Sequence, residues 1–141
     1  MNLLDSDSGK QRLLTVEIPV IERYNAGRDP DYRIRIAKEN GGLALRYRLK
    51  PGHNVYEVET RLHSTYPVTP PETRVVTELV QCPHLLRDQT LCLWKQGSTR
   101  QTSRWDPAQF TCVFAAQAAW RWLACYEIWH ATGEWPLPDA R

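Results

Sequence analysis

The segment from residue 81 to residue 94 contains the residue types that acyl-transfer chemistry uses. It reads Gln-Cys-Pro-His-Leu-Leu-Arg-Asp-Gln-Thr-Leu-Cys-Leu-Trp and places Cys92 eight positions after His84. A cysteine thiolate is a strong nucleophile, and a nearby imidazole can raise the thiolate fraction or donate a hydrogen bond to an oxyanion. Cys92 and His84 are therefore our candidate catalytic residues. Because Cys/His pairs also recur by accident, the spacing alone leaves the role open.

Two other chemistries fit parts of the same segment. A zinc site would use Cys82, His84 and Cys92, but Cys-x-His lacks the usual pair of closely spaced cysteines, and no fourth ligand has suitable spacing. A thiol hydrolase would need a third residue to orient the histidine, and the sequence indicates none. Asp88 could orient an attacking amine, although an Asp-Gln pair is more typical of a turn. We therefore predict no metal and no cofactor.

Two of the remaining cysteines are interpreted as packing residues. Cys112 and Cys125 fall inside a predicted helix, and free cysteine is among the most frequently buried residue types. We expect all four thiols to be free, because a reducing cytosol disfavours disulfides. A chain of 141 residues can also bury a sufficient core without them.

Alternating hydropathy predicts antiparallel strands on the N-terminal side of the cysteine segment. Period-two patterns run from residue 31 to an Asn-Gly-Gly turn and continue over 43–49 and 55–62. Short turns join these three strands, so we expect a meander. Residues 66–71 contain three prolines and must cross in an extended conformation. The β-branched run 73–80 predicts a fourth strand.

The N-terminal region is harder to assign. Residues 11–24 carry apolar side chains at helical spacing, but Pro19 lacks an amide hydrogen, and the surrounding Leu-Thr-Val-Glu-Ile-Pro-Val also suits a strand. We favour a helix that ends before Pro19. The polar residues 1–10 are expected to form a flexible tail.

A long helix is predicted near the C-terminus. Asp106 suits the N-cap and Pro107 suits the first helical position. Apolar side chains then recur at helical spacing until Gly133, which is a natural C-terminal stop. We expect Trp105 to anchor the start of this helix in the core. Trp94 is expected to be more exposed and able to contact a partner.

Composition and charge narrow the class of protein. The chain has 141 residues, of which 42% are hydrophobic, so one domain spanning 1–141 is expected. No run approaches the roughly 20 apolar residues that a membrane helix needs. The net charge of +2 lacks the concentrated positive field of nucleic-acid-binding proteins. These features predict a cytoplasmic protein with neither a nucleic-acid nor a membrane partner.

Four motifs occur in a characteristic order along the chain. They are Tyr-Pro-x-x-Pro-Pro at 66–71, Cys-Pro-His at 82–84, Leu-Cys-Leu at 91–93 and Trp-Asp-Pro-Ala at 105–108. In this order they resemble the ubiquitin-conjugating enzyme family, whose motifs are Tyr-Pro-x-x-Pro-Pro, His-Pro-Asn, Ile-Cys-Leu and Trp-Ser-Pro-Ala. The resemblance implies an α+β, ubiquitin-conjugating-like (UBC-like) fold. In that fold a four-stranded antiparallel meander carries a long C-terminal helix packed on it.

Three departures from that family resemble a bacterial branch found in antiphage, CBASS-type operons. His84 stands at the asparagine position, the segment between Cys92 and Trp105 is longer than usual, and the sequence continues only briefly after one long helix. The bacterial branch carries Pro-His and a C-terminal pattern of Trp-Leu and Thr-Gly-x-Trp-Pro. Trp122-Leu123 and residues 132–136 match that pattern.

The resemblance also implies a function. Cys92 would accept an acyl group as a thioester and pass it to an amine. His84 would donate a hydrogen bond to the oxyanion, relay a proton, or only tie the loop to backbone carbonyls. The implied cargo is the C-terminus of a cGAS-like nucleotidyltransferase, or alternatively a ubiquitin-like protein attached to phage proteins, with a separate adenylating enzyme. A non-catalytic UBC-like binding module is the remaining alternative.

The segment 95–104 is an insertion relative to the family. It carries Lys95, Arg100 and Arg104 and no acidic residue. We favour a solvated loop over a docking surface for an acidic partner.

Overall fold

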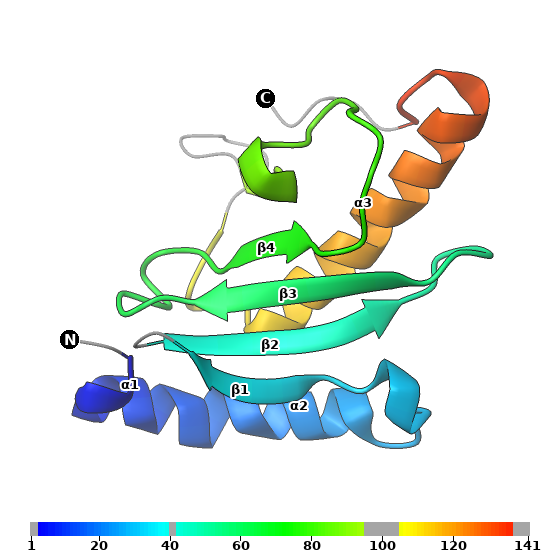
Figure 1. The fold of residues 1–141 in the computed structure, drawn as a ribbon. Helices are drawn as coiled ribbons and strands as arrows, with labels where there is room; N and C mark the ends of the chain where they lie inside the picture. The colour runs from blue at the N-terminus through cyan, green and yellow to red at the C-terminus, as the bar shows by residue number, and fades with distance from the viewer. Residues whose placement is uncertain (1–2, 40–41, 95–104, 137–141) are drawn as a thin grey trace.

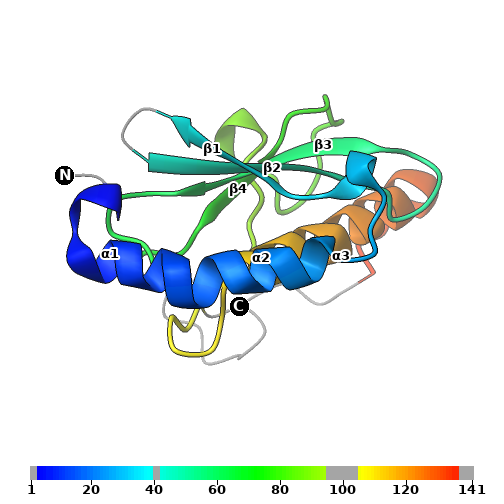
Figure 2. The ribbon, with the colours of Figure 1, turned by 90° about the horizontal axis from the view of Figure 1, so that it is seen from below.

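The computed structural model describes residues 3–39, 42–94 and 105–136, and its centre is a four-stranded antiparallel sheet (Figure 1). The strands are neighbours in chain order: β1 (Arg35–Glu39), β2 (Gly42–Leu49), β3 (Tyr56–Leu62) and β4 (Glu72–Val75). The N-terminal helical segment and the long C-terminal helix lie against one face of this sheet (Figure 2). The α+β class, the meander and the long C-terminal helix predicted from the sequence are thus confirmed.

The register of the strands buries one face of the sheet. Leu45 on β2 stands opposite Thr60 on β3, and Val58 on β3 stands opposite Val75 on β4; all four are buried. Arginine and glutamate side chains from the alternate positions pair on the other face. One-sided burial is the physical reason for the alternation that predicted these strands.

The predicted hairpin is confirmed by the pairing of β1 with β2, whose last partners are Glu39 and Gly42. The turn residues Asn40 and Gly41 lie outside the described residues. β1 begins at Arg35 rather than near residue 31, because the preceding residues form a 3-10 turn, η3 (Pro30–Tyr32). The carboxylate of Asp29 caps that turn by accepting the backbone N–H of the residue two positions later, with an N···O distance of 2.9 Å.

β4 ends at Val75 rather than at Val80, where we expected it to end. The backbone N–H of Val76 donates one more bond to the carbonyl of Glu57, with an N···O distance of 2.7 Å. The hydroxyl of Thr77 accepts the N–H of Glu57 at 2.8 Å. Beyond this point a glutamine side chain, described below, binds the backbone, so β-branched composition alone overestimated the strand.

The N-terminal residues form a helical segment rather than a flexible tail. It consists of η1 (Leu3–Asp5), α1 (Asp7–Arg12), a π-helical turn η2 (Leu13–Glu17) and α2 (Ile18–Asn25). Residues 3–10, which we expected to be a tail, are held because the side chain of Leu3 is fully buried in the core. Burial of that apolar side chain offsets the entropy lost on ordering the chain end.

The helical segment also continues past Pro19, contrary to our prediction. The π-helical turn η2 comes directly before this proline, and the N–H of Ile18 bonds to the carbonyl of Leu13, five residues back. In a regular α-helix a proline ring clashes with the carbonyl four residues back, and the wider π turn relieves that clash. Pro19 then lies in the first turn of α2, where no N–H is needed.

The helix α3 (Cys112–Thr132) begins later than predicted. Asp106 does not cap it but closes a separate turn, in which its carboxylate accepts the N–H of Ala108 at 2.9 Å. The backbone carbonyl of Asp106 also accepts the N–H of Phe110 at 2.9 Å. Thr111 is extended and is the residue that precedes the helix. The Asp-Pro pair therefore forms a turn of its own, and our prediction that it starts the helix was wrong.

The end of α3 is as predicted. Gly133 adopts a left-handed conformation with φ of 82°, and its N–H donates to the carbonyl of Trp129 at 2.7 Å. Within the described ranges, no helix is long and apolar enough to cross a membrane.

A buried carboxylate joins the N-terminal helices to the start of α3. Glu17 is fully buried and accepts hydrogen bonds from Arg12 Nε at 2.6 Å, the Tyr66 hydroxyl at 2.8 Å and the Cys112 backbone N–H at 2.9 Å. The side chain of Thr111 makes no capping bond. Glu17 therefore supplies, from another helix, the acceptor that the N-terminus of α3 requires.

Candidate active site

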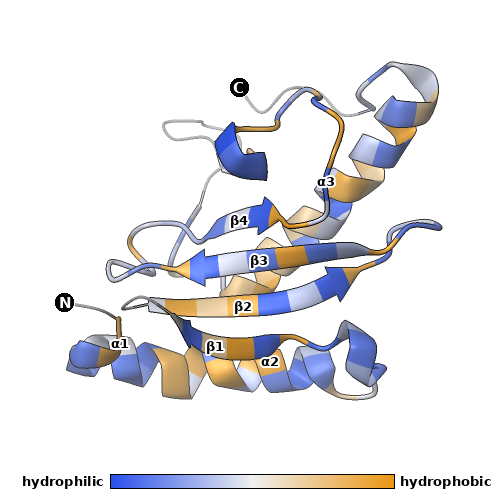
Figure 3. Ribbon diagram, in the orientation of Figure 1, coloured by the Kyte–Doolittle hydropathy of each residue, from blue (hydrophilic) through white to orange (hydrophobic). Residues whose placement is uncertain are grey.

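The loop between β4 and α3 joins the two predicted site residues through the backbone. The N–H of Cys92 donates to the carbonyl of His84 at 3.0 Å, and the N–H of Leu86 donates to the carbonyl of Thr90 at 2.7 Å. Residues 84–92, which we call the active-site loop, therefore fold back on themselves. The turn η4 (Arg87–Gln89) forms the tip of this loop and is hydrophilic (Figure 3).

Cys92 is more accessible than the other three cysteines. Its side chain is half-buried, whereas Cys82, Cys112 and Cys125 are buried. Burial raises the pKa of each of those three thiols, and the carboxylate of Glu17 raises the pKa of Cys112 further. A raised pKa keeps a thiol protonated and unreactive. The packing role expected for Cys112 and Cys125 is confirmed, and Cys92 is the thiol a reactant can reach.

His84 occupies a conformation that few residues tolerate. Its φ of 62° lies in the left-handed region, where asparagine and histidine are enriched among non-glycine residues. This backbone requirement gives a physical reason why histidine can stand at the asparagine position of the motif. The His84 ring is half-buried, with its centroid 5.1 Å from that of Trp135.

The C-terminal half of α3 holds the chain around His84. The hydroxyl of Tyr126 accepts the N–H of Val80 at 2.9 Å, and Trp122 Nε1 donates to the carbonyl of His84 at 3.3 Å. The centroid of the Trp135 ring lies 5.3 Å from that of Trp122. The cap at Gly133 turns the chain back, and Trp135 then packs against both Trp122 and His84. The C-terminal tryptophan motifs therefore position the active-site loop.

Gln89 is a positioning residue that sequence reasoning missed. Its Nε2 donates to the carbonyls of Val75 and Thr77 at 2.7 and 2.8 Å, and its Oε1 accepts the N–H of Leu79 at 2.7 Å. The side chain thus replaces a strand partner for the chain that leaves β4. The Asp-Gln pair does form the predicted turn, with positive φ at both residues. No local pattern indicates partners ten or more residues away.

Asp88 lies exposed at the tip of the active-site loop. It borders a shallow cleft of about 460 Å³ between the loop and the outer face of the sheet, lined by Arg61, Glu72, Arg74, Asp88, Gln89 and Thr90. The zinc alternative requires Cys82, His84 and Cys92 as ligands. In the described part of the chain, no three histidine, cysteine or acidic side chains are grouped to hold a metal ion.

Two tryptophans hold the proline-rich crossing beside the loop. Trp105 Nε1 donates to the carbonyl of Pro67 at 2.7 Å, and Trp94 Nε1 donates to the carbonyl of Pro71 at 3.1 Å. Trp105 packs against the core as expected. Trp94 and Trp105 are both half-buried, with ring centroids 5.1 Å apart, so the burial classes do not separate the two as we expected. The insertion 95–104, with its three basic residues, lies outside the described residues.

Comparison with known proteins adds one finding. A family model described as Type II CBASS E2 protein matches residues 26–141. The matched range begins just after α2 and includes the whole sheet, the active-site loop and α3. No curated protein matches the sequence.

Proposed function

The chain belongs to the family of Type II CBASS E2 proteins, and from that premise we propose that it conjugates proteins in antiphage defence by carrying an acyl group on Cys92. One observation carries this proposal. Cys92 is the half-exposed thiol, and its own N–H is bound to the carbonyl of His84 on a loop that other side chains hold in place. A nucleophile on a rigidly supported loop is the arrangement that acyl transfer requires.

The proposed reaction has two steps. In the first, the Cys92 thiolate attacks the carbonyl carbon of an activated C-terminus on a partner enzyme. A carbon–sulfur bond forms, and the bond to the leaving group breaks as that group departs with its electron pair. In the second step an amine attacks the thioester. A carbon–nitrogen bond forms, the Cys92 thiolate leaves, and the proton lost by the amine passes to a base or to water.

We propose that the imidazole of His84 donates a hydrogen bond to the oxyanion of the tetrahedral intermediate. The Trp122 bond to its carbonyl and the Trp135 ring beside its imidazole support this role, because they limit how the residue can move.

The role of His84 is tested by comparing two substitutions that both suit φ of 62°. Glycine adopts this conformation without strain, and asparagine tolerates it, but only asparagine has a side-chain donor. His84→Asn should retain transfer activity, and His84→Gly should lose roughly 100-fold or more, as when an oxyanion donor is removed. Equal activity in both variants, measured as single-turnover release from Cys92, would show that the side chain is not the donor.

The proposed cargo is the C-terminus of a cGAS-like nucleotidyltransferase, activated by a separate adenylating enzyme. The test is to replace Cys92 with serine or lysine, which would trap the acyl group as a stable ester or amide, and to weigh the intact protein purified from its host. A mass increment equal to the nucleotidyltransferase supports the proposal. An increment equal to a ubiquitin-like protein would mean that Cys92 carries that protein instead of the nucleotidyltransferase, by the same acyl-transfer chemistry. No adduct, with partners still co-purifying, would leave a binding module.

A further inference from the structure

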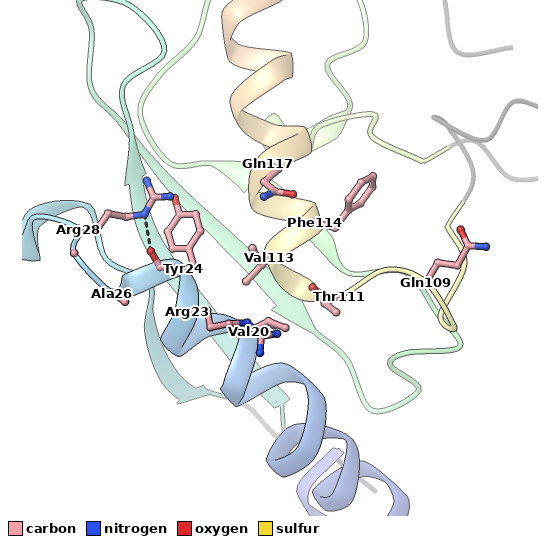
Figure 4. Close-up of a pocket in the computed structure, with 11 residues that line it drawn as sticks. Val20, Arg23, Tyr24, Ala26, Arg28, Gln109, Thr111, Val113, Phe114 and Gln117 are labelled. Atoms are coloured by element: carbon pink, nitrogen blue, oxygen red, sulfur yellow. Dashed lines mark hydrogen bonds between the residues drawn. The ribbon is translucent and has the colours of Figure 1, made fainter.

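The two ends of α3 meet different parts of the molecule. At its N-terminal end Val113 and Gln117 border an open cleft of about 690 Å³, whose other wall carries Val20 and Tyr24 from α2 (Figure 4). None of the described residues that line this cleft belongs to the active-site loop. The C-terminal end of α3 and the turn after it contact His84 instead. The end of the helix is therefore the part of α3 that reaches the proposed site.

The chain after α3 forms a short hook, residues 132–135, which local hydrogen bonds hold in place. The hydroxyl of Thr132 donates to a backbone carbonyl one turn earlier at 2.8 Å and accepts the N–H of Glu134 at 3.2 Å. Gly133, with its left-handed φ of 82°, reverses the direction of the chain. The helix end thus determines where Trp135 lies.

Trp122 and Trp135 hold different parts of His84. The buried Trp122 donates from Nε1 to the backbone carbonyl of His84 at 3.3 Å. Trp135 contacts the side chain, with its ring plane at 55° to the imidazole and the two centroids 5.1 Å apart. The Trp135 ring also packs edge-on against that of Trp122, at 61° and 5.3 Å. Tilted and edge-on ring pairs at such distances are favourable.

The orientation of the imidazole needs a restraint of this kind. The left-handed backbone and the bond from Trp122 fix the main chain of His84, but the outer side-chain torsion of histidine has a broad distribution that the backbone does not set. A hydrogen bond weakens steeply as its angle departs from linear. A donor to an oxyanion must therefore have its ring held by a neighbour, and Trp135 is a neighbour in contact with that ring.

We propose that Trp135 is a positioning residue for acyl transfer, which holds the imidazole of His84 in the orientation that donates to the oxyanion. The inference rests on the proposed function, because it takes that imidazole as the donor. Trp135 lies beyond the helix cap and is half-buried, whereas Trp122 is buried in the core. Loss of the Trp135 ring should accordingly slow transfer while the sheet and α3 stay folded.

The experiment measures single-turnover release of an acyl group from Cys92 to free lysine. The thioester is loaded by exchange with a synthetic peptide thioester, whose thiol leaves as the Cys92 thiolate attacks. Trp135→Ala should lower the maximal rate roughly tenfold without changing the lysine concentration that gives half of it. Trp135→Phe, which keeps a ring, should stay within about twofold of the unmodified protein. In a His84→Gly background, Trp135→Ala should change the rate less than about twofold.

Trp129→Ala is the matched control. Trp129 is also a half-buried tryptophan near the end of α3, but its ring packs against Tyr126 and His130. Its loss should change the release rate less than about twofold. Circular dichroism of every variant checks that the fold is kept.

A second measurement detects the ring contact without any acyl chemistry. In proton–carbon NMR spectra of the Cys92→Ala protein, the imidazole signal of His84 is identified by its loss in the His84→Gly variant. Trp135→Ala should shift this signal, because the indole ring perturbs the magnetic field at its neighbour. Trp129→Ala should leave it in place.

The outcomes separate this inference from the proposed function. If Trp135→Ala shifts the His84 signal but releases lysine conjugate as fast as Trp129→Ala, the contact is only packing and the inference fails alone. A tenfold loss that persists in the His84→Gly background also overturns it, because Trp135 would then act without the imidazole. If the unmodified protein forms no thioester at Cys92, the proposed function fails and this inference fails with it.

Discussion

The start of α3 and the active-site loop are both held by side-chain hydrogen bonds, but the two sets differ in charge and burial. At the start of α3 the acceptor is the fully buried carboxylate of Glu17, which binds Arg12, Tyr66 and Cys112. At the active-site loop the corresponding group is the neutral, half-buried amide of Gln89.

From this difference we expect the Glu17 cluster to determine the stability of the fold, and the Gln89 bonds to affect mainly the reactivity of the loop that holds Cys92. A buried ion cannot lose a partner without leaving an uncompensated charge, so the Glu17 cluster acts as one unit that fixes the fold. Neutral hydrogen bonds are worth about 1 kcal/mol each, so the loss of one Gln89 bond should cost the fold less than the loss of one partner of Glu17. The two cysteines follow the same division. Burial, and next the carboxylate of Glu17, raise the pKa of Cys112, while Cys92 is half-exposed.

Loss of the Cys92 thiol should have the largest effect. Cys92→Ala should abolish formation of any acyl adduct, and it should change the free energy of unfolding by less than about 0.5 kcal/mol, because the residue is not in the core. Cys112→Ser should do the reverse, since it places a polar group in a fully buried position beside Glu17. The measurements are intact mass after partner loading and urea denaturation. If both variants lost the adduct equally and were equally stable, the assignment of Cys92 to reactivity and of Cys112 to packing would be contradicted.

Removal of the buried Glu17 carboxylate should cause the largest loss of unfolding free energy among these variants. Glu17→Ala leaves Arg12 without its buried partner and should lower the free energy of unfolding by about 3–5 kcal/mol. The matched control is Glu57→Ala, which breaks the half-exposed pair between Glu57 and Arg48, with a 2.6 Å distance between Oε1 and Nε. That change should cost less than about 1 kcal/mol. Similar losses of unfolding free energy in both variants would mean that the cluster at Glu17 stabilises the fold no more than a half-exposed ion pair does.

Loss of the Gln89 amide should have a smaller, mixed effect. Gln89→Ala removes three hydrogen bonds and should lower the free energy of unfolding by about 1–3 kcal/mol. The loss stays this small because water can bind part of the backbone that the substitution exposes. Acyl transfer should fall roughly tenfold without loss of the Cys92 thiol, since the loop would be less well positioned. Gln81→Ala, at an exposed glutamine nearby, is the control and should leave both quantities unchanged. A stability loss without any change in transfer rate would show that Gln89 supports only the fold.

Several features could be read from the sequence because they depend on neighbours along the chain. The period-two patterns located β2 and β3, since alternate side chains of a strand face alternate sides of the sheet. Gly133 marked the end of α3, because a left-handed cap favours glycine. Cys92 could be proposed as the nucleophile because four motifs in fixed order surround it. That assignment stays a prediction until an adduct is measured.

The tertiary structure alone decided the features that depend on partners far away in the chain. Glu17 looks like an ordinary helical glutamate, yet it is fully buried because Tyr66 and Cys112 reach it from distant segments. The start of α3 was misplaced for the same reason, since its capping acceptor comes from another helix. Gln89 can bind the backbone after β4 only because this strand ends at Val75, earlier than its composition predicted. A polar side chain is buried only where donors or acceptors from other elements meet it, and local pattern does not contain that information.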